Sequence, residues 1–162
     1  MVNDILQQLA TWVDGMETWQ QVLALIPIGA IPFIESFFAA LLGTAAGIHP
    51  AIAIPAAVVG NMISTFAVIA LSGRARDAVS GRRERPEKKT SKIRQKVAAA
   101  LDRYGVPGVA LLGPFVIASQ ITAPTMIALG ATRSRVYLWM GVSITAWGLL
   151  FGLFGNLLST AL

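Results

Sequence analysis

The sequence predicts an all-α integral membrane protein with two inverted repeats, each a re-entrant helical hairpin followed by one transmembrane helix. Three observations carry this prediction. Of the 162 residues, 55% are hydrophobic and only 13% are charged, whereas soluble domains are about 25% charged. The basic residues gather in one segment, and two long apolar stretches are each interrupted near their middle. So much apolar surface is typical of contact with lipid.

The charge is divided unevenly along the chain. Residues 73–97 hold ten of the 13 basic residues and three acids, which gives this segment +7 and the remainder −2. A basic segment between two apolar halves is typical of a cytoplasmic loop under the positive-inside rule. We therefore expect a multi-pass protein of a bacterial-type cytoplasmic membrane, with membrane lipids as partners and no nucleic acid.

The remaining elements follow from apolar spacing and from proline. Apolar residues of 5–19 recur at helical spacing and include two tryptophans, which predicts an interfacial amphipathic helix. Proline is favoured in a first helical turn, so we expect one span from Pro50 to about Leu71. The uncharged stretch 136–162 fits a second span from about Val136 to Leu158. The predicted organisation is one membrane domain, 1–162, with an interfacial helix (1–19), repeat 1 (20–72), a basic loop (73–97) and repeat 2 (98–162).

The stretches 20–48 and 104–132 carry the predicted hairpins. Pro32 lies in a break at residues 31–36, and Pro124 ends a polar break at residues 119–124. The arms on either side of each break are about 10–15 residues long, which is typical of re-entrant segments rather than of full spans. Pro32 and Pro124 are therefore the predicted hairpin breaks.

A comparison of the two stretches suggests an internal repeat. A shift of 87 positions places Pro27 on Pro114 and Gly43 on Gly130. Each broken stretch is followed by one apolar span. If each hairpin turns back, each repeat crosses the membrane once and the two halves are inverted, as in many transporters.

The positive-inside rule favours re-entrant hairpins over four ordinary spans. Four spans with a cytoplasmic 73–97 loop would place Arg133 and Arg135 outside, whereas hairpins return both to the inner face together with every other basic residue. The hairpin arrangement also places both termini outside. Irregular backbone at membrane depth is tolerated where protein covers it or where it lines a wet cavity.

Glu35 is the one acid inside an apolar stretch and lies next to the first break. A charged group at the membrane centre costs about 2.5–3.5 kcal/mol on insertion scales, so this residue needs a partner, a proton or water. It either caps the second arm of the hairpin together with Ser36, where free N–H groups favour negative charge, or serves transport. We expect it to bind and release protons in a transport cycle.

Arginines and hydroxyl groups form the candidate substrate site. Arg133 and Arg135 either anchor the hairpin at the inner headgroup layer or bind an anionic group, because the guanidinium fork suits phosphate. The polar residues near the two breaks either satisfy backbone groups or line a substrate path. They are Ser36, Ser119, Gln120, Thr122 and Thr125.

The composition also excludes classes of site. The chain has no cysteine and one histidine, which excludes disulfides, thiolate metal sites and a Ser-His-Asp triad. A single intramembrane acid, without a paired carboxylate, a metal cluster or a nucleophile–base pair, does not make up a recognisable catalytic site. We therefore expect no metal, no cofactor and no enzymatic activity.

Small residues four apart predict close helix packing. Ala56 with Gly60, and Gly148 with Gly152, have the small-xxx-small spacing of packed membrane helices. Two spans and two hairpins leave irregular backbone that must be covered. We expect a homo-oligomer, with a dimer favoured, and these faces offer contact surfaces.

The chain resembles two related membrane families. The run from Ile31 to Phe38, followed by Leu42-Gly43, resembles the first re-entrant motif of the DedA-type superfamily. Residues 103–130 resemble the second half of the small multidrug export family. The resemblance implies two facing re-entrant hairpins, an essential acid that matches Glu35, and an arginine that matches Arg133 or Arg135. The run 118–122 departs from the proline- and glycine-rich turn of relatives.

Three functions compete at this point. A proton-linked translocase of a lipid phosphate, such as a polyprenyl-phosphate carrier or a phospholipid, would use the arginines for phosphate and Glu35 as the switch. A proton-coupled exporter of cationic drugs or other small amphiphiles would use Glu35 alone. A non-transporting membrane scaffold would need neither. The expected function is the lipid-phosphate translocase.

Overall fold

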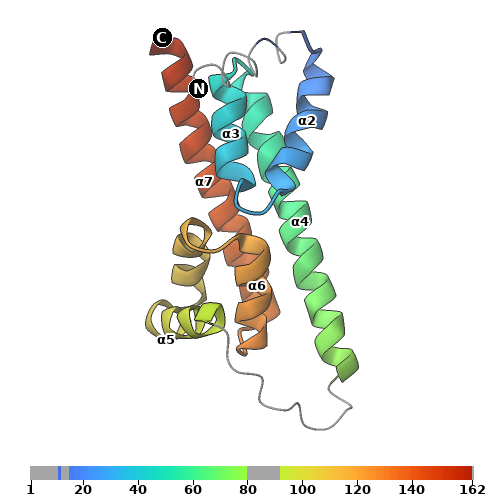
Figure 1. Cartoon of the computed structure of the whole chain (residues 1–162), viewed down its shortest axis with the longest axis vertical. Coiled ribbons are helices and arrows are strands. Elements are labelled where there is room, and N and C mark those ends of the chain that lie inside the picture. The colour runs from blue at the N-terminus through green and yellow to red at the C-terminus, as the bar shows by residue number, and fades with distance from the viewer. Residues whose placement is uncertain (1–10, 12–14, 80–91, 162) are drawn as a thin grey trace. The chain divides into compact units, whose positions relative to one another are not determined.

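The computed structural model describes residues 11, 15–79 and 92–161, and its regular structure in these ranges is entirely helical (Figure 1). Most of the predicted interfacial helix lies outside the described residues. The elements are α2 (Thr18–Ala30), α3 (Glu35–Ala45), α4 (Pro50–Val79), α5 (Lys92–Leu112), the short 3-10 helix η1 (Gly113–Phe115), α6 (Ser119–Ala128) and α7 (Arg133–Ala161).

Within the described part of the chain, two helices are long and apolar enough to cross a membrane. They are Pro50–Ser72 within α4 and Arg133–Thr160 within α7, and a span needs about 20 residues. The predicted apolar helices from Pro50 and Val136 are therefore confirmed. By contrast, α2, α3 and α6 have 13, 11 and 10 residues and are too short to span.

The predicted loop 73–97 is wrong at both ends. Helix α4 continues to Val79, and α5 begins at Lys92. The helix continues beyond the apolar stretch because alanine and arginine are strong helix formers and no proline interrupts residues 74–79. Residues 80–91 lie outside the described part of the chain.

The chain divides into two compact units. The first contains the described residues up to Ser64 together with those from Ile144 onward, and the second contains Thr65–Ser143. Both long helices are shared, since residues 50–64 of α4 and 144–161 of α7 belong to the first unit. The units therefore differ from the predicted repeats 20–72 and 98–162, in which each repeat holds its own span.

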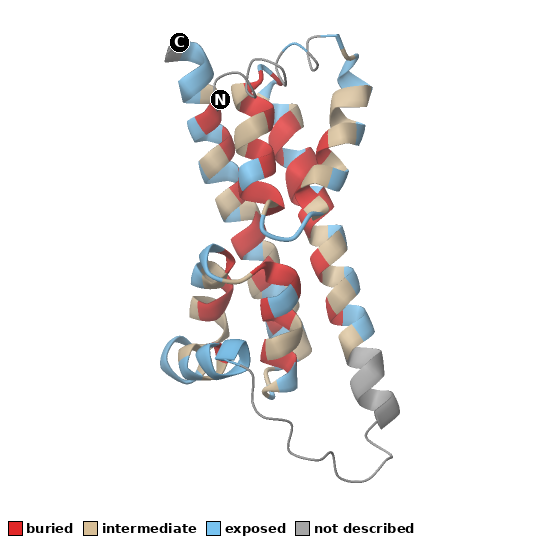
Figure 2. Ribbon diagram, viewed as in Figure 1, coloured by how far each residue is buried: buried red, intermediate tan, exposed pale blue. Residues whose placement is uncertain are grey.

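In the first unit, α2 and α3 pack as a hairpin and α2 closely approaches α4. A Cβ atom at Gly60 would clash with the carbonyl group of Ile26, and one at Gly29 would clash with that of Ala57. Only glycine permits such contact between backbones. Burial follows these contacts on the inner faces of the helices (Figure 2).

A stripe of glycines on α7 packs against α3 in the same unit. A Cβ atom at any of them would lie within 3.4 Å of a small residue of α3, in the pairs Gly148 with Ser36, Gly152 with Ala40, and Gly155 with Thr44. At Gly148 and Gly152 it would come closer still to Val58 and Ile54 of α4. Gly60 likewise packs against Ile26 of α2, and Ala56 is buried in the core, with 5% of its surface exposed. These faces are therefore not the predicted oligomer contacts, because helices of the same chain already fill them.

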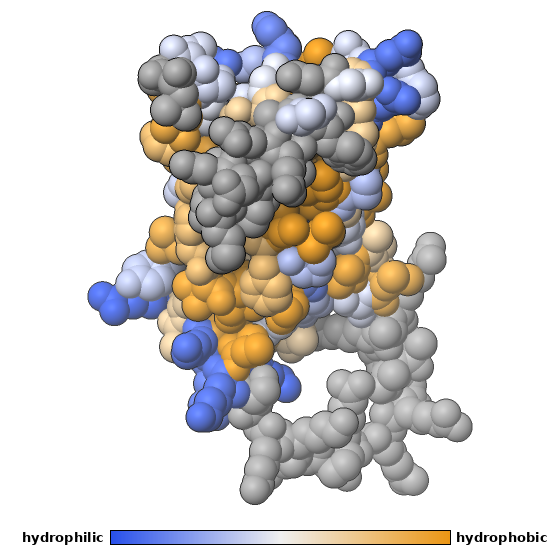
Figure 3. Space-filling view, turned by 45° about the horizontal axis from the view of Figure 1, so that its top comes forward, coloured by the Kyte–Doolittle hydropathy of each residue, from blue (hydrophilic) through white to orange (hydrophobic). Residues whose placement is uncertain are grey.

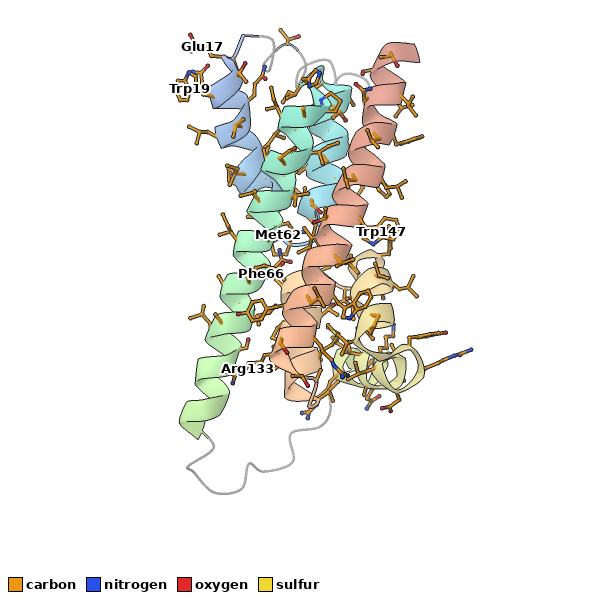
Figure 4. The ribbon with its side chains drawn as sticks, turned by 180° about the vertical axis from the view of Figure 1, so that it is seen from behind. Glu17, Trp19, Met62, Phe66, Arg133 and Trp147 are labelled. Atoms are coloured by element: carbon orange, nitrogen blue, oxygen red, sulfur yellow. The ribbon has the colours of Figure 1, made fainter. Side chains whose placement is uncertain are left out.

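The second unit has its own core and a bent helix. Gly105 has φ 65° and ψ −174°, which breaks α5 into residues 92–104 and 106–112. The Ser143 hydroxyl donates a hydrogen bond of 2.7 Å to the Ala110 carbonyl and joins α7 to α5. Phe66 of α4 and Tyr137 of α7 pack edge to face with ring centroids 5.0 Å apart; Phe66 is labelled in Figure 4.

The second break lies earlier in the chain than predicted. Helix α6 begins at Ser119 and continues through Pro124, so Pro124 is not a hairpin break. The chain turns instead at residues 116–118, after η1, which begins with Gly113-Pro114. Proline removes the one hydrogen bond from its own nitrogen to residue 120; the other bonds of this short helix remain available. The first break is confirmed at residues 31–34, which include Pro32.

Both hairpins end in the same turn. Gly47 has φ 92° and Gly130 has φ 105°, and each is followed by a residue whose N–H reaches back five positions, Ile48 to Gly43 and Ala131 to Met126, both at 3.0 Å. This is the Schellman pattern, which favours glycine. Gly130 thus corresponds to Gly47, 83 positions earlier, and the register of 87 is wrong because it aligned Gly130 with a glycine inside α3.

Candidate functional site

Glu35 is the first residue of α3 and is buried in the first unit. It directly follows the turn 31–34 and is 1% exposed. Its φ is 53°, and that of Phe33 is 72°. A residue with a Cβ atom pays about 1–2 kcal/mol in this left-handed region, so the surrounding structure must hold the turn in place. Such strain clusters at functional sites.

A hydrogen bond from the residue after Glu35 fixes the start of α3. The Ser36 hydroxyl donates a hydrogen bond of 2.8 Å to the Ile144 carbonyl of α7, across 108 positions of sequence. Ser36 is 1% exposed. Its hydroxyl therefore joins α3 to α7 one residue after the acid, which is a structural role for a residue predicted to bind substrate.

Aromatic rings line α3 and α7 beyond this serine. The Phe37 ring lies 5.5 Å from that of Phe151, which lies 6.1 Å from the indole of Trp147, the tryptophan labelled on α7 in Figure 4. The adjoining core cluster is aliphatic, with Ala39 and Ala40 fully buried. Glu35 thus begins a helix whose second turn contributes to an apolar core.

The formal charge of the sequence differs sharply between the two units. All 13 lysines and arginines belong to the second unit, which also has four acids and a charge of +9. The first unit has four acids and a charge of −4. A buried carboxyl group in a unit without lysine or arginine is suited to bind a proton or a cation.

The polar residues of α6 divide into two groups. Ser119 and Gln120 are 0% and 9% exposed at the start of the helix. The hydroxyls of Thr122 and Thr125 donate to the carbonyls of Ile117 and Ile121 at 3.1 Å and 2.7 Å. These bonds favour the interpretation that the two threonines satisfy local backbone groups over the interpretation that they line a substrate path.

The arginines lie at the other end of α6. Arg133 is the first residue of α7 and half-buried, and Arg135 is exposed; Figure 4 labels Arg133. Helix α6 has ten residues, which is about 15 Å at 1.5 Å per residue. The structure therefore does not bring the arginines together with Ser119 and Gln120, although all four belong to the second unit.

The second unit also holds an apolar groove that the sequence reading missed. It has a volume of about 140 Å³ and lies among the two segments of α5, η1 and Thr122 of α6. Lys96 is the one charged residue that lines it. Apolar residues at helical spacing in 93–104 indicate an amphipathic helix, and Gly105 is the signal for the bend that makes the groove.

No group of three or more histidine, cysteine, aspartate or glutamate side chains that could hold a metal ion occurs among the described residues. No protein-family model matches the chain, and neither a curated protein nor a solved structure is significantly similar to it.

Proposed function

We propose that this chain is a multi-pass membrane transporter in which Glu35 binds and releases a proton during the cycle. Two helices long and apolar enough to span support the membrane placement. Large hydrophobic side chains of α7 are exposed, among them Leu138 at 62% and Leu157 at 64%. Broad apolar areas also cover the described surface on the face drawn in Figure 3. Exposed apolar surface on this scale favours lipid as the surrounding solvent.

The single observation that carries the transport proposal is the backbone of Glu35. A helix cap needs no strained conformation, because an acid at the start of a helix stabilises it from an ordinary extended residue. Here the acid has φ 53° and is 1% exposed. A strained, buried carboxyl group beside an apolar core favours a proton site over a cap.

A lipid phosphate is the substrate class that we favour. Arg133 and Arg135 begin a helix of 29 residues, and a helix N-terminus and a guanidinium fork both favour phosphate. The resemblance to small multidrug export and DedA-type proteins supports two facing re-entrant hairpins and an arginine after the second one. In this proposal the arginines hold the phosphate and Glu35 is the proton-linked switch.

An exporter of small cations is the second candidate, and a specific observation favours it. The unit that contains Glu35 has no lysine or arginine and a formal charge of −4. A carboxyl group in such surroundings attracts a cation or a proton in exchange, as an exporter of cationic drugs requires. In this second candidate the arginines only anchor the chain at the cytoplasmic face.

The membrane arrangement belongs to the same proposal. The arginines and the basic residues of 73–97 lie on the cytoplasmic side, and both termini lie outside. Single cysteines introduced into this cysteine-free chain can be labelled from either face of the membrane. External labelling at position 133 would contradict the re-entrant arrangement and favour four spans.

Reconstituted liposomes test the function. A fluorescent lipid phosphate and a cationic dye are each assayed with and without a proton gradient. Gradient-dependent movement of the lipid phosphate supports the favoured substrate, and movement of the dye alone supports the second candidate. A well-folded protein that moves neither substrate in either condition contradicts transport of these two classes.

A further inference from the structure

The bend in α5 makes the groove of the second unit. Gly105 has φ 65°, which glycine adopts without strain. A Cβ atom at Gly108 would clash with the Cβ atom of Tyr104, so glycine is also needed for the two segments of α5 to approach. Pro107 lies in the first turn after the bend, where its fixed φ suits a helix start. The sequence 105–108 thus encodes the groove.

The groove suits a hydrocarbon chain. Its volume is about 140 Å³, and aliphatic side chains make up most of its lining. Apolar cavities of about 150 Å³ stay dry and bind benzene-sized molecules. The rim is apolar and exposed, with Tyr104 at 50%, Leu112 at 57% and Val116 at 66%. A linear chain can therefore enter from the surface and extend beyond the groove.

Positive charge lies beside this apolar slot. Lys96 lines the groove and is exposed. Residues 92–104 contain four basic residues and one acid. The Arg103 guanidinium lies 5.1 Å from the centre of the Tyr104 ring, a cation–π distance that keeps this charge near the rim. The occupant should therefore combine a hydrocarbon chain with an anionic group.

We propose that the groove binds one acyl chain of an anionic phospholipid and that Lys96 contacts its phosphate group. The inference goes beyond the proposed function: it needs contact with lipid but no transport, and neither Glu35 nor Arg133 takes part in it. The segment 92–104 is then a membrane-surface helix whose groove fixes one lipid at a defined position.

Native mass spectrometry of the delipidated full-length chain in mild detergent tests the proposal. Phosphatidylglycerol and phosphatidylcholine with identical acyl chains are added separately. We expect one phosphatidylglycerol to be retained about tenfold more strongly than phosphatidylcholine, because the choline cation offsets the phosphate charge that attracts Lys96 and its basic neighbours, whereas phosphatidylglycerol keeps a net negative charge. Equal retention of the two lipids would overturn the contact with Lys96. Inorganic phosphate should not compete, and competition at equal concentration would overturn the role of the acyl chain.

Two matched pairs of variants locate the site. Ala100 lines the groove and Ala99 does not, so A100L should lower phosphatidylglycerol retention about tenfold by filling hydrocarbon space, whereas A99L should not. Lys92 is exposed outside the groove, so K96Q should remove the preference for phosphatidylglycerol while K92Q keeps it. Because Lys96 is exposed, its replacement leaves the core intact even if A100L folds poorly.

Further outcomes separate this proposal from its rivals. If A100L retains phosphatidylglycerol normally but changes the oligomeric mass, the groove holds a second copy of the chain and the lipid proposal fails. E35Q should retain the lipid as the wild type does, so a failure of proton-linked transport leaves this result standing. Retention by A100L and K96Q at the wild-type level would place the lipid elsewhere and overturn the proposal.

Discussion

The two hairpins of this chain end alike and begin differently. Each closes with a Schellman turn on a left-handed glycine, Gly47 or Gly130, three residues before a long helix begins at Pro50 or Arg133. At the tip, the first hairpin has a strained four-residue turn and a buried acid. The second hairpin has a 3-10 helix and begins α6 with the buried Ser119.

This difference distinguishes the residues that set the backbone of both hairpins from the one proposed to bind a proton. The register of 83 positions that relates the closing turns places Ser36 on Ser119 and the acid Glu35 on Ala118. Both serines and this alanine are buried, so the second hairpin keeps the packing position but has a methyl group where the first has a carboxyl group. The shared residues set the backbone, and the proposed proton site exists in one hairpin only.

The largest expected effect is the destabilisation of the first unit by a large side chain in the glycine stripe of α7. In G152L, the new side chain would press on Ile54 and on Ala40, which is 0% exposed. Overpacking a core costs about 1–3 kcal/mol and occasionally more, and this contact is between whole helices. We expect the thermal transition in detergent to fall sharply or to be lost.

The neighbouring residue supplies the control for that change. Leu153 is 52% exposed on the same helix, so L153A should shift stability by only about 0.5 kcal/mol, as at other surface positions. An unaltered transition in G152L would mean that Gly152 does not pack closely on Ile54 of α4 and Ala40 of α3.

The next effect tests the charge difference between the units. Neutralising the two arginines at the start of α7, R133Q with R135Q, removes charge-assisted hydrogen bonds to phosphate, so lipid-phosphate flux should fall at least about tenfold. Flux of a cationic dye should stay the same or rise. R133K with R135K keeps the charge without the planar fork and should retain part of the flux. Normal lipid-phosphate flux in the glutamine pair would remove the arginines from the site.

A smaller effect tests whether the two closing turns are equivalent. No atom would lie within 4 Å of a Cβ atom added at Gly47 or Gly130, so the cost of alanine there is conformational alone. G47A and G130A should each lower the free energy of unfolding by about 1–2 kcal/mol. G47N and G130N should cost less, because asparagine tolerates the left-handed region. Clearly unequal costs for the two alanines would mean that the two closing turns are not equivalent.

The smallest effect concerns the two interhelical hydroxyls. Ser36 donates to Ile144 and Ser143 donates to Ala110, at 2.8 Å and 2.7 Å. S36A and S143A should each cost about 1 kcal/mol, the net worth of one intramolecular hydrogen bond. The control S159A removes an exposed bond within one helix turn and should cost less. Thermal unfolding of the three variants gives the order.

Local sequence patterns, which depend on one helix turn or less, predicted the helix start and the first break correctly. Pro50 opens α4 as its position predicts, and the first break includes Pro32. The second break lies earlier than the polar run that ends at Pro124 predicts, because this run forms part of a helix. The chain had already turned at residues 116–118, and α6 continues past this proline. Proline at a single position cannot by itself distinguish the start of a helix from its interior.

Residue letters alone could not show which glycine closes each hairpin or where the glycine faces pack. Gly43 lies inside α3, whereas Gly47 has the left-handed backbone. The small residues around Gly60 and Gly148 predict close packing correctly, but the partner helices are in the same chain. The carboxyl group of Glu35 could be singled out because it interrupts an apolar stretch, whereas the strain in its backbone is visible only in the structure.

Proton-gradient-driven flux in liposomes containing E35Q tests directly whether Glu35 is the proton site. E35D serves as the partial variant and E17Q as the matched control, because Glu17 is the other described acid of the first unit and is exposed. We predict that E35Q folds normally but loses gradient-dependent flux, that E35D retains part of it, and that E17Q matches the wild type. A folded E35Q protein with wild-type gradient dependence toward both the lipid phosphate and the cationic dye would contradict Glu35 as the proton site.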